Sequence, residues 1–113
     1  MRVAAVITDL MLFSRIDEVV RVAGGLLQRV DEPAALPRST SVDLVLIDWS
    51  ARGESWGRDL SDWGAAADGP RVILFGPHTD LEAHLAARAA GLGPMWARSR
   101  LLRDLPTVVG VER

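Results

Sequence analysis

The feature that most constrains the fold is a short apolar run at residues 44–47, with Val42 just before it, that ends abruptly on Asp48. A continuous apolar run of this length predicts a strand buried on both faces, as in the centre of a parallel sheet. Open α/β sheets bind their ligands at the carboxyl ends of such strands. Asp48 is therefore the first candidate site residue.

The rest of the chain alternates between strand and helix patterns. Four further strands are expected, the second of them weaker and towards an edge: residues 3–7, 26–30, 71–75 and 94–97. Apolar residues recurring at helical spacing predict helices at 10–23, 56–67, 81–90 and within 101–111. Two prolines limit residues 31–40 to about one helical turn. Residues 51–54 are expected to form a loop and residues 68–70 a turn.

Capping signals set several of the boundaries. The Gly24-Gly25 pair is expected to end the first helix, and Thr79 or Asp80 to cap the helix at 81–90. In the last helix, Asp104 as N-cap would place Pro106 comfortably in the first turn.

This order of elements predicts an α/β fold. Right-handed crossovers favour a five-stranded parallel sheet, flavodoxin-like and doubly wound, with strand order 2-1-3-4-5. The whole chain, residues 1–113, is expected to form one domain. Its ligand crevice should lie above the first and third strands, where Thr8, Asp9 and Asp48 end them.

Composition excludes several classes of function. A net charge of −2 argues against nucleic-acid binding. Without cysteine the chain has neither disulfides nor thiolate metal ligands, and without lysine it has no Schiff-base or Walker-type chemistry. No apolar run has membrane-spanning length, and the N-terminus enters a strand rather than a signal peptide. We therefore expect a cytoplasmic protein.

The strand ends resemble those of the receiver domain of bacterial response regulators, and the likeness covers nearly the whole chain. In that family, two acids after the first strand hold Mg²⁺, and an Asp after the third accepts a phosphoryl group. A Thr or Ser after the fourth strand and a Lys after the fifth contact that group. The chemistry is phosphoryl transfer onto a carboxylate, with cations neutralising the oxygen charge.

The match at these positions is partial. Residues 46–49 fit the phosphoacceptor strand, with Asp48 as the acceptor equivalent. Thr8 replaces the first acid, whereas Asp9 keeps the second. Gly76 stands where the hydroxyl residue belongs, and Arg98 replaces the lysine. This last exchange is not conservative, because a guanidinium is a planar fork.

The resemblance is thus to the degenerate, or pseudo-receiver, branch of the family. Ser99 replaces the proline that usually follows the lysine. Residues 9–16, 75–80 and 97–100 are also similar to small stand-alone bacterial receiver-like proteins of unknown role. Losing one carboxylate is expected to weaken Mg²⁺ binding by Asp9 and Asp48.

Each candidate also has a structural interpretation. Asp48 fits a polar strand end satisfied by neighbouring amides, and Asp9 fits an N-cap of the first helix. His78 lies at the rim of the crevice, where it would either complete a metal site with the two acids or face solvent. We expect Arg98 to pair with Asp48 directly, which would mimic neutralisation of the site without phosphate.

Four tryptophans are unusual in a chain without tyrosine. Core packing accounts for Trp63 and Trp96, whereas Trp49 and Trp56 would mark a binding surface if they were exposed. Trp96 lies on the strand where receivers carry a switching aromatic. The helix at 81–90, the fifth strand and the last helix correspond to the face through which receivers dimerise.

Four functional interpretations follow. The leading one is a stand-alone receiver-like regulatory domain that binds protein partners, a homodimer included, with phosphorylation impaired or absent and no cofactor. The alternative is a phosphorylatable receiver with Asp48 as acceptor and weak Mg²⁺ binding. A third interpretation is a flavodoxin-style ligand binder, but this chain lacks the Gly-rich phosphate loop after the first strand that such a binder needs. The fourth is an enzyme with a mechanism of its own, but the chain contains no set of catalytic residue types at a suggestive spacing.

Overall fold

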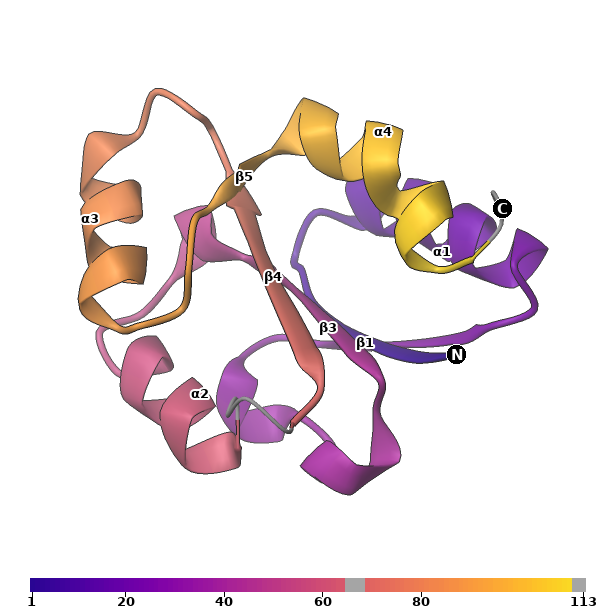
Figure 1. Ribbon diagram of the computed structural model, residues 1–113, viewed down its shortest axis with the longest axis horizontal. Coiled ribbons are helices and arrows are strands. Elements are labelled where there is room, and N and C mark those ends of the chain that lie inside the picture. Colours follow the sequence, from indigo (N-terminus) through magenta and orange to yellow (C-terminus); the bar gives the residue numbers. More distant parts are fainter. Residues whose placement is uncertain (65–68, 111–113) are drawn as a thin grey trace.

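The computed structural model describes residues 1–64 and 69–110, which form one parallel sheet between two layers of helices. The strands are β1 (Arg2–Val6), β2 (Leu26–Val30), β3 (Leu44–Asp48), β4 (Arg71–Gly76) and β5 (Trp96–Ala97). The helices are α1 (Leu10–Val22), α2 (Trp56–Trp63), α3 (Leu81–Ala89) and α4 (Arg98–Val108). Figure 1 shows α1 and α4 on one face of the sheet and α2 and α3 on the other.

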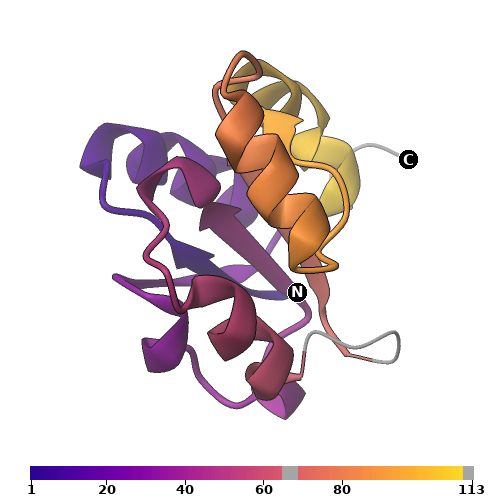
Figure 2. The ribbon, with the colours of Figure 1, turned by 90° about the vertical axis from the view of Figure 1, so that its left-hand side faces the viewer.

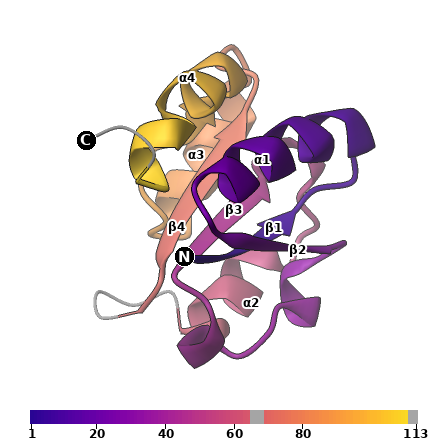
Figure 3. The same cartoon turned by 90° about the vertical axis from the view of Figure 1, so that its right-hand side faces the viewer.

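The strand order is β2-β1-β3-β4-β5, with every pair parallel, so the predicted 2-1-3-4-5 topology is confirmed. β2 lies at one edge, as its weak pattern indicated, and β5 at the other. Figure 2 views the layer of α2 and α3, and Figure 3 views the layer of α1 and α4 from the opposite side.

β3 is the central strand, and all five of its residues are buried. Leu44 and Leu46 pack in the layer of α1 and α4, whereas Val45 and Ile47 pack in the layer of α2 and α3. Because side chains alternate along a strand, Asp48 continues on the side of α1 and α4. On that side α4 begins at Arg98, whose guanidinium reaches Asp48.

The last helix differs from the prediction. α4 begins at Arg98 directly after β5, and its N-cap is Ala97 rather than Asp104. The Asp104 side chain accepts hydrogen bonds from Arg100 and Arg103, so it does not cap the helix. Pro106 lies inside α4 near its end, where little helix follows the proline and a kink disturbs few contacts.

The bounds of α2 and β5 also differ from the prediction. α2 ends at Trp63 because Gly64, with φ 106°, closes it in the left-handed conformation; residues 65–67 of the expected helix lie outside the described residues. Residue 68 of the expected turn lies outside them too. β5 has two residues rather than four, since Pro94 lacks the N–H that a strand pair needs.

The remaining local predictions are close to the structure. Residues 31–41 contain only short 3₁₀ turns, at Pro33–Ala35 and Ser39–Ser41. A third turn, Trp49–Ala51, precedes the loop expected at residues 51–54 and overlaps it at Ala51. Asp80 caps α3 by accepting from the Ala83 N–H at 3.1 Å, which decides between the two predicted caps. None of the helices in the described part of the chain has the length and apolar character that crossing a membrane requires.

Candidate functional site

The candidate site lies at the carboxyl edge of the sheet. Asp48 ends β3 and is the one buried charged residue that we find among the described residues, only 3% exposed. Thr8 and Asp9 follow β1, Gly76 ends β4 and Arg98 follows β5. The parallel sheet therefore brings the sequence-predicted positions to one edge.

Both carboxylate oxygens of Asp48 have partners. Oδ1 accepts from the Ser50 hydroxyl and from the Ser50 N–H, the latter at 3.2 Å. Oδ2 accepts from Nη2 of Arg98 at 3.3 Å. The expected ion pair between Asp48 and Arg98 is thus present, and the chain itself supplies a counter-charge to the buried acid.

Asp9 has two roles in the structure. Its Oδ1 accepts from the N–H groups of Met11 and Leu12 at 3.0 and 3.1 Å, which confirms the predicted N-cap of α1. Its Oδ2 lies 3.7 Å from Nη1 of Arg98. One oxygen holds the helix end, and the other faces the guanidinium.

Arg98 therefore bridges the two acids, with Nη1 towards Asp9 and Nη2 towards Asp48. Its side chain is 42% exposed, so the pairs are partly screened by solvent. Nε is a buried donor without a hydrogen-bond partner among the described residues. The guanidinium thus contributes its two Nη groups, not its whole donor set, to the bridge.

Gly76 lies beside a packed side chain rather than beside an open space. A Cβ built on Gly76 would lie 3.0 Å from Sδ of Met95 and 3.6 Å from Cβ of Ser50. The first distance is below ordinary van der Waals contact, so a hydroxyl residue at position 76 requires Met95 to shift.

The structure does not bring the other candidates into the bridge. Thr8, His78 and Ser99 are exposed, and the structure gives their side chains no hydrogen bond within the described residues. The carbonyl oxygen of His78 lies 3.0 Å from Nε2 of His84. Within residues 1–64 and 69–110, no three His, Asp or Glu side chains lie close enough to hold a metal ion. The structure therefore does not bring Asp9, Asp48 and His78 together as a three-residue metal site.

The tryptophans beside the site belong to the core. Trp49 and Trp56 are 2% and 8% exposed, so neither marks a binding surface. The indole N–H of Trp49 donates to the carbonyl oxygen of Ala83 at 2.9 Å, which ties the turn after β3 to α3. Trp63 similarly donates to the carbonyl oxygen of Pro37.

Two residues of the site were missed at the sequence level. Ser50 follows Asp48 by two positions, a spacing at which Asp side chains often bond the backbone, so this signal was available. Met95 carried no such signal, because its contact with Gly76 depends on how β4 and the segment before β5 pack.

Comparison with known proteins gives one kind of match. A scan against family models finds none, and a search of curated proteins finds none. Among solved structures, the receiver domain of Francisella response regulator 1452 matches with a TM-score of 0.72 at 16% identity, over 97% of this chain and 93% of that chain. The ChxR receiver domain from Chlamydia trachomatis matches with a TM-score of 0.58 at 17% identity, over the same shares.

The chain has the receiver fold. This agrees with the resemblance found in the sequence, and the fold class is confirmed. Within the receiver fold, Asp48 occupies the end of the third strand, and Arg98 follows the fifth. The region between β2 and β3 contains short 3₁₀ turns, so the fold is completed here with four helices among the described residues.

Proposed function

We propose that this receiver-fold chain is a regulatory domain that acts by binding a protein partner, with phosphorylation of Asp48 impaired or absent. One observation carries the proposal: Arg98 contacts the carboxylates of both Asp9 and Asp48. The function is regulatory and requires no reaction catalysed by the chain.

The Arg98 bridge supports this proposal through electrostatics. Mg²⁺ requires a shell of oxygen ligands and prefers charged ones. Here the oxygens that would face the ion, Oδ2 of Asp9 and of Asp48, face a guanidinium instead. A metal ion would have to displace Arg98 and would find Thr8 where the receiver family supplies a second acid. These residues therefore fit a guanidinium better than they fit Mg²⁺.

The surroundings of Gly76 support the same proposal. A receiver responds to phosphorylation through a hydroxyl residue at this position, which Gly76 cannot replace. The nearby hydroxyl group belongs to Ser50, and it already bonds Asp48. Met95 packs where a side chain at position 76 would begin. The parts that would register a phosphoryl group are thus replaced by packing and by a local hydrogen bond.

A second candidate function rests on Asp48 itself. The acid is retained at the end of β3 with Asp9 close by, which favours a phosphorylatable receiver that binds Mg²⁺ weakly. In this alternative Arg98 would swing from Oδ2 of Asp48 to the phosphoryl oxygens, and Thr8 would substitute imperfectly for an acid. The two candidates differ in whether Asp48 can be modified.

The test is incubation of the protein with acetyl phosphate and MgCl₂, followed by intact-mass measurement. The proposal predicts no phosphorylated species for the wild type or for Asp48→Asn. A phosphorylated fraction that is absent from Asp48→Asn would establish the alternative instead. A phosphorylatable receiver domain treated in parallel shows that the phosphodonor is active.

The proposed partner is either a second copy of the chain or another protein. Receivers form dimers through a face that corresponds here to α3, β5 and α4, and we propose this face for the partner. We propose that the protein works in the cytoplasm, where it needs neither a membrane nor a nucleic acid. The charge of the α3–β5–α4 face distinguishes between the two kinds of partner.

A further inference from the structure

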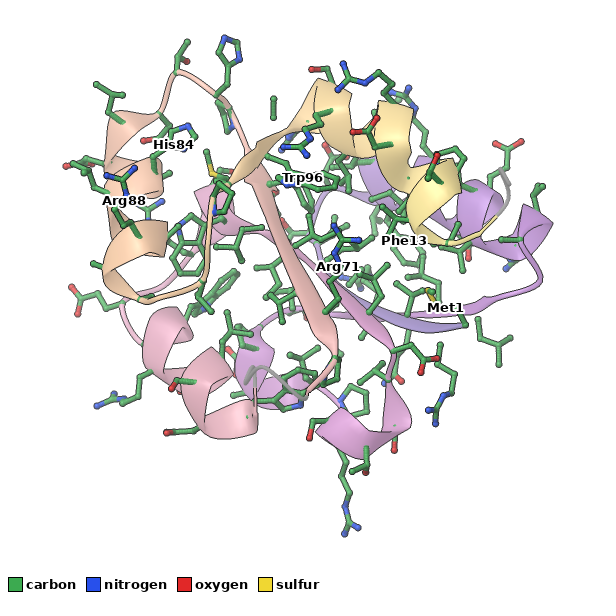
Figure 4. The ribbon with its side chains drawn as sticks, viewed as in Figure 1. Met1, Phe13, Arg71, His84, Arg88 and Trp96 are labelled. Carbon is green, nitrogen blue, oxygen red and sulfur yellow. The ribbon has the colours of Figure 1, made fainter. Side chains whose placement is uncertain are left out.

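The edge of the sheet at β5 opens between α3 and α4, and we call this surface the β5 face. Figure 4 looks onto it, with His84 and Arg88 on α3 and with Arg71 and Trp96 at the centre. Its defining residues come from four elements: Arg71, His84, Arg88, Trp96, Arg100 and Arg103.

Trp96 lies at the centre of the β5 face under two guanidinium groups. Cζ of Arg100 is 4.0 Å from the centroid of the indole ring, and Cζ of Arg71 is 5.7 Å from it. Stacking orders the arginine side chains and leaves N–H groups at the edges of the guanidinium planes able to donate, although Nε of Arg100 already donates to Asp104. The ring is thereby covered, and the cations above it are held ready for an anion.

The β5 face is basic although the chain carries a net charge of −2. Arg71 and Arg88 are exposed and have no acidic partner among the residues that the structure describes. The acid that we find on this face is Asp104, which pairs with both Arg100 and Arg103. These two arginines lower the pKa of Asp104, so its charge is already committed to them. Among the described residues, positive charge therefore remains uncompensated around Trp96.

A hollow adjoins this charge on the side of α3. It has a volume of about 370 Å³ and is lined by His84, Arg88, Gly91, Gly93 and Pro94. Arg88 and His84 lie one helical turn apart, so both reach its rim. The hollow offers a recess for a side chain of a partner that is anchored on the arginines.

We propose that the β5 face binds an acidic segment of a different protein rather than a second copy of this chain. This rests on the proposed function, in which the domain acts through a protein partner. Self-pairing through the same patch would set its arginines against the equally basic patch of the second copy, and like charges across an interface are unfavourable. An acidic segment would instead neutralise them, with a tryptophan and arginines as the anchoring residue types.

A protein segment fits this surface better than a nucleic acid does. The basic charge is confined to a few arginines around a packed indole, and the chain as a whole is acidic. A nucleic acid needs a longer basic surface along its phosphate backbone than the β5 face provides. Beyond this face its phosphates would be repelled by the net negative charge of the chain.

The test is fluorescence anisotropy of a labelled peptide of alternating glutamate and leucine, with a glutamine-for-glutamate peptide as the uncharged control. We expect wild-type protein to bind only the glutamate peptide. Replacing Arg71 and Arg100 together by glutamine should weaken binding about tenfold. Arg58→Gln, an exposed arginine on α2, should leave it unchanged. Arg88→Gln provides a second variant, which should also weaken binding and whose side chain has no acidic partner to lose among the described residues.

Three results would overturn the inference. One is equal weakening by Arg58→Gln, which would show a non-specific charge effect. Another is tighter binding of a single-stranded DNA oligonucleotide than of the peptide. The third is a wild-type dimer in sedimentation that the Arg71 and Arg100 replacements dissociate. We expect Asp48→Asn to bind the peptide as the wild type does, because the β5 face does not include Asp48. Phosphorylation of Asp48 would therefore contradict the proposed function alone and leave this inference standing.

Discussion

Nη2 of Arg98 lies 3.3 Å from Oδ2 of Asp48, so the buried acid at the end of β3 is neutralised by a residue of the same chain. A carboxylate that is 3% exposed requires such a partner, because an unpaired buried charge is costly. The pair also joins β3 to the start of α4, two elements that are far apart in the sequence. The stability of the fold therefore depends on whether Asp48 is charged and paired with Arg98.

The first prediction concerns this pair. Arg98→Ala should lower the free energy of unfolding by about 1–2 kcal/mol, because it leaves Oδ2 of Asp48 buried without its cation. Urea unfolding measures the change. In an Asp48→Asn background the same substitution should cost much less, since the charge is gone. An equal cost in both backgrounds would show that Arg98 stabilises α4 independently of Asp48.

The second prediction concerns the packing beside Gly76. Gly76→Thr should destabilise the protein by about 1–3 kcal/mol, because the added Cβ meets Sδ of Met95 at 3.0 Å. Met95→Ala should remove most of this additional cost, although it creates a cavity of its own. Chemical denaturation of the two single variants and the double variant measures the coupling. Strict additivity would contradict the close contact.

The third prediction concerns the indole of Trp49. Trp49→Phe should cost about 1–3 kcal/mol, because the carbonyl oxygen of Ala83 loses its buried donor. Trp63→Phe is the matched control: it also loses a hydrogen bond, to Pro37, but its ring is only half-buried. We expect thermal unfolding to show the smaller shift for Trp63→Phe. A larger shift for that variant would mean that water reaches Ala83 readily.

The fourth prediction concerns pH. The backbone N–H of Arg2, and then its guanidinium, hold the pKa of Asp43 below its ordinary value of 3.8. Because the folded-state pKa is lowered, the carboxylate contributes its full stabilisation above its ordinary pKa of 3.8, and this contribution is lost as pH falls through the folded-state pKa. Asp43→Asn should therefore be less stable than wild type at neutral pH, with a difference that shrinks towards about pH 3.

Urea unfolding at several pH values checks this dependence. Glu18→Gln removes an exposed acid of α1 and serves as the control that should show no such trend. A difference between wild type and Asp43→Asn that is constant across the range would mean that the hydrogen bond from Arg2 does not depend on the charge of Asp43.

Much of the fold could be predicted because burial and local signals agree. The apolar run before Asp48 is central in the sheet, and the weak pattern of residues 26–30 corresponds to an edge strand. The cap at Asp9 was predicted correctly, and Asp80 was one of the two caps predicted for α3, because each cap depends on a few neighbouring residues. Sequence patterns alone were sufficient where the physical cause is local.

The failures arise where competing contacts, local or distant, decide the structure. Asp104 looked like a cap, but Arg100 and Arg103 take its carboxylate, and α4 begins at Arg98, six residues earlier in the chain. The contact of Met95 with Gly76 was missed, because it depends on packing that no local pattern encodes. The pair of Arg98 and Asp48 is also a distant contact, but it was predicted because the family resemblance identified both positions.

The measurement that tests the central claim most directly is tryptophan fluorescence during titration with Mg²⁺ and then beryllofluoride, an analogue of the phosphoryl group. Trp49, adjacent to Asp48, is the reporter. The wild type and Asp48→Asn should both show no saturable change. A Thr8→Asp and Arg98→Lys double variant, which restores two receiver residues, should bind Mg²⁺. A saturable wild-type response that disappears in Asp48→Asn would show that Arg98 leaves the site open to phosphorylation, contradicting the account.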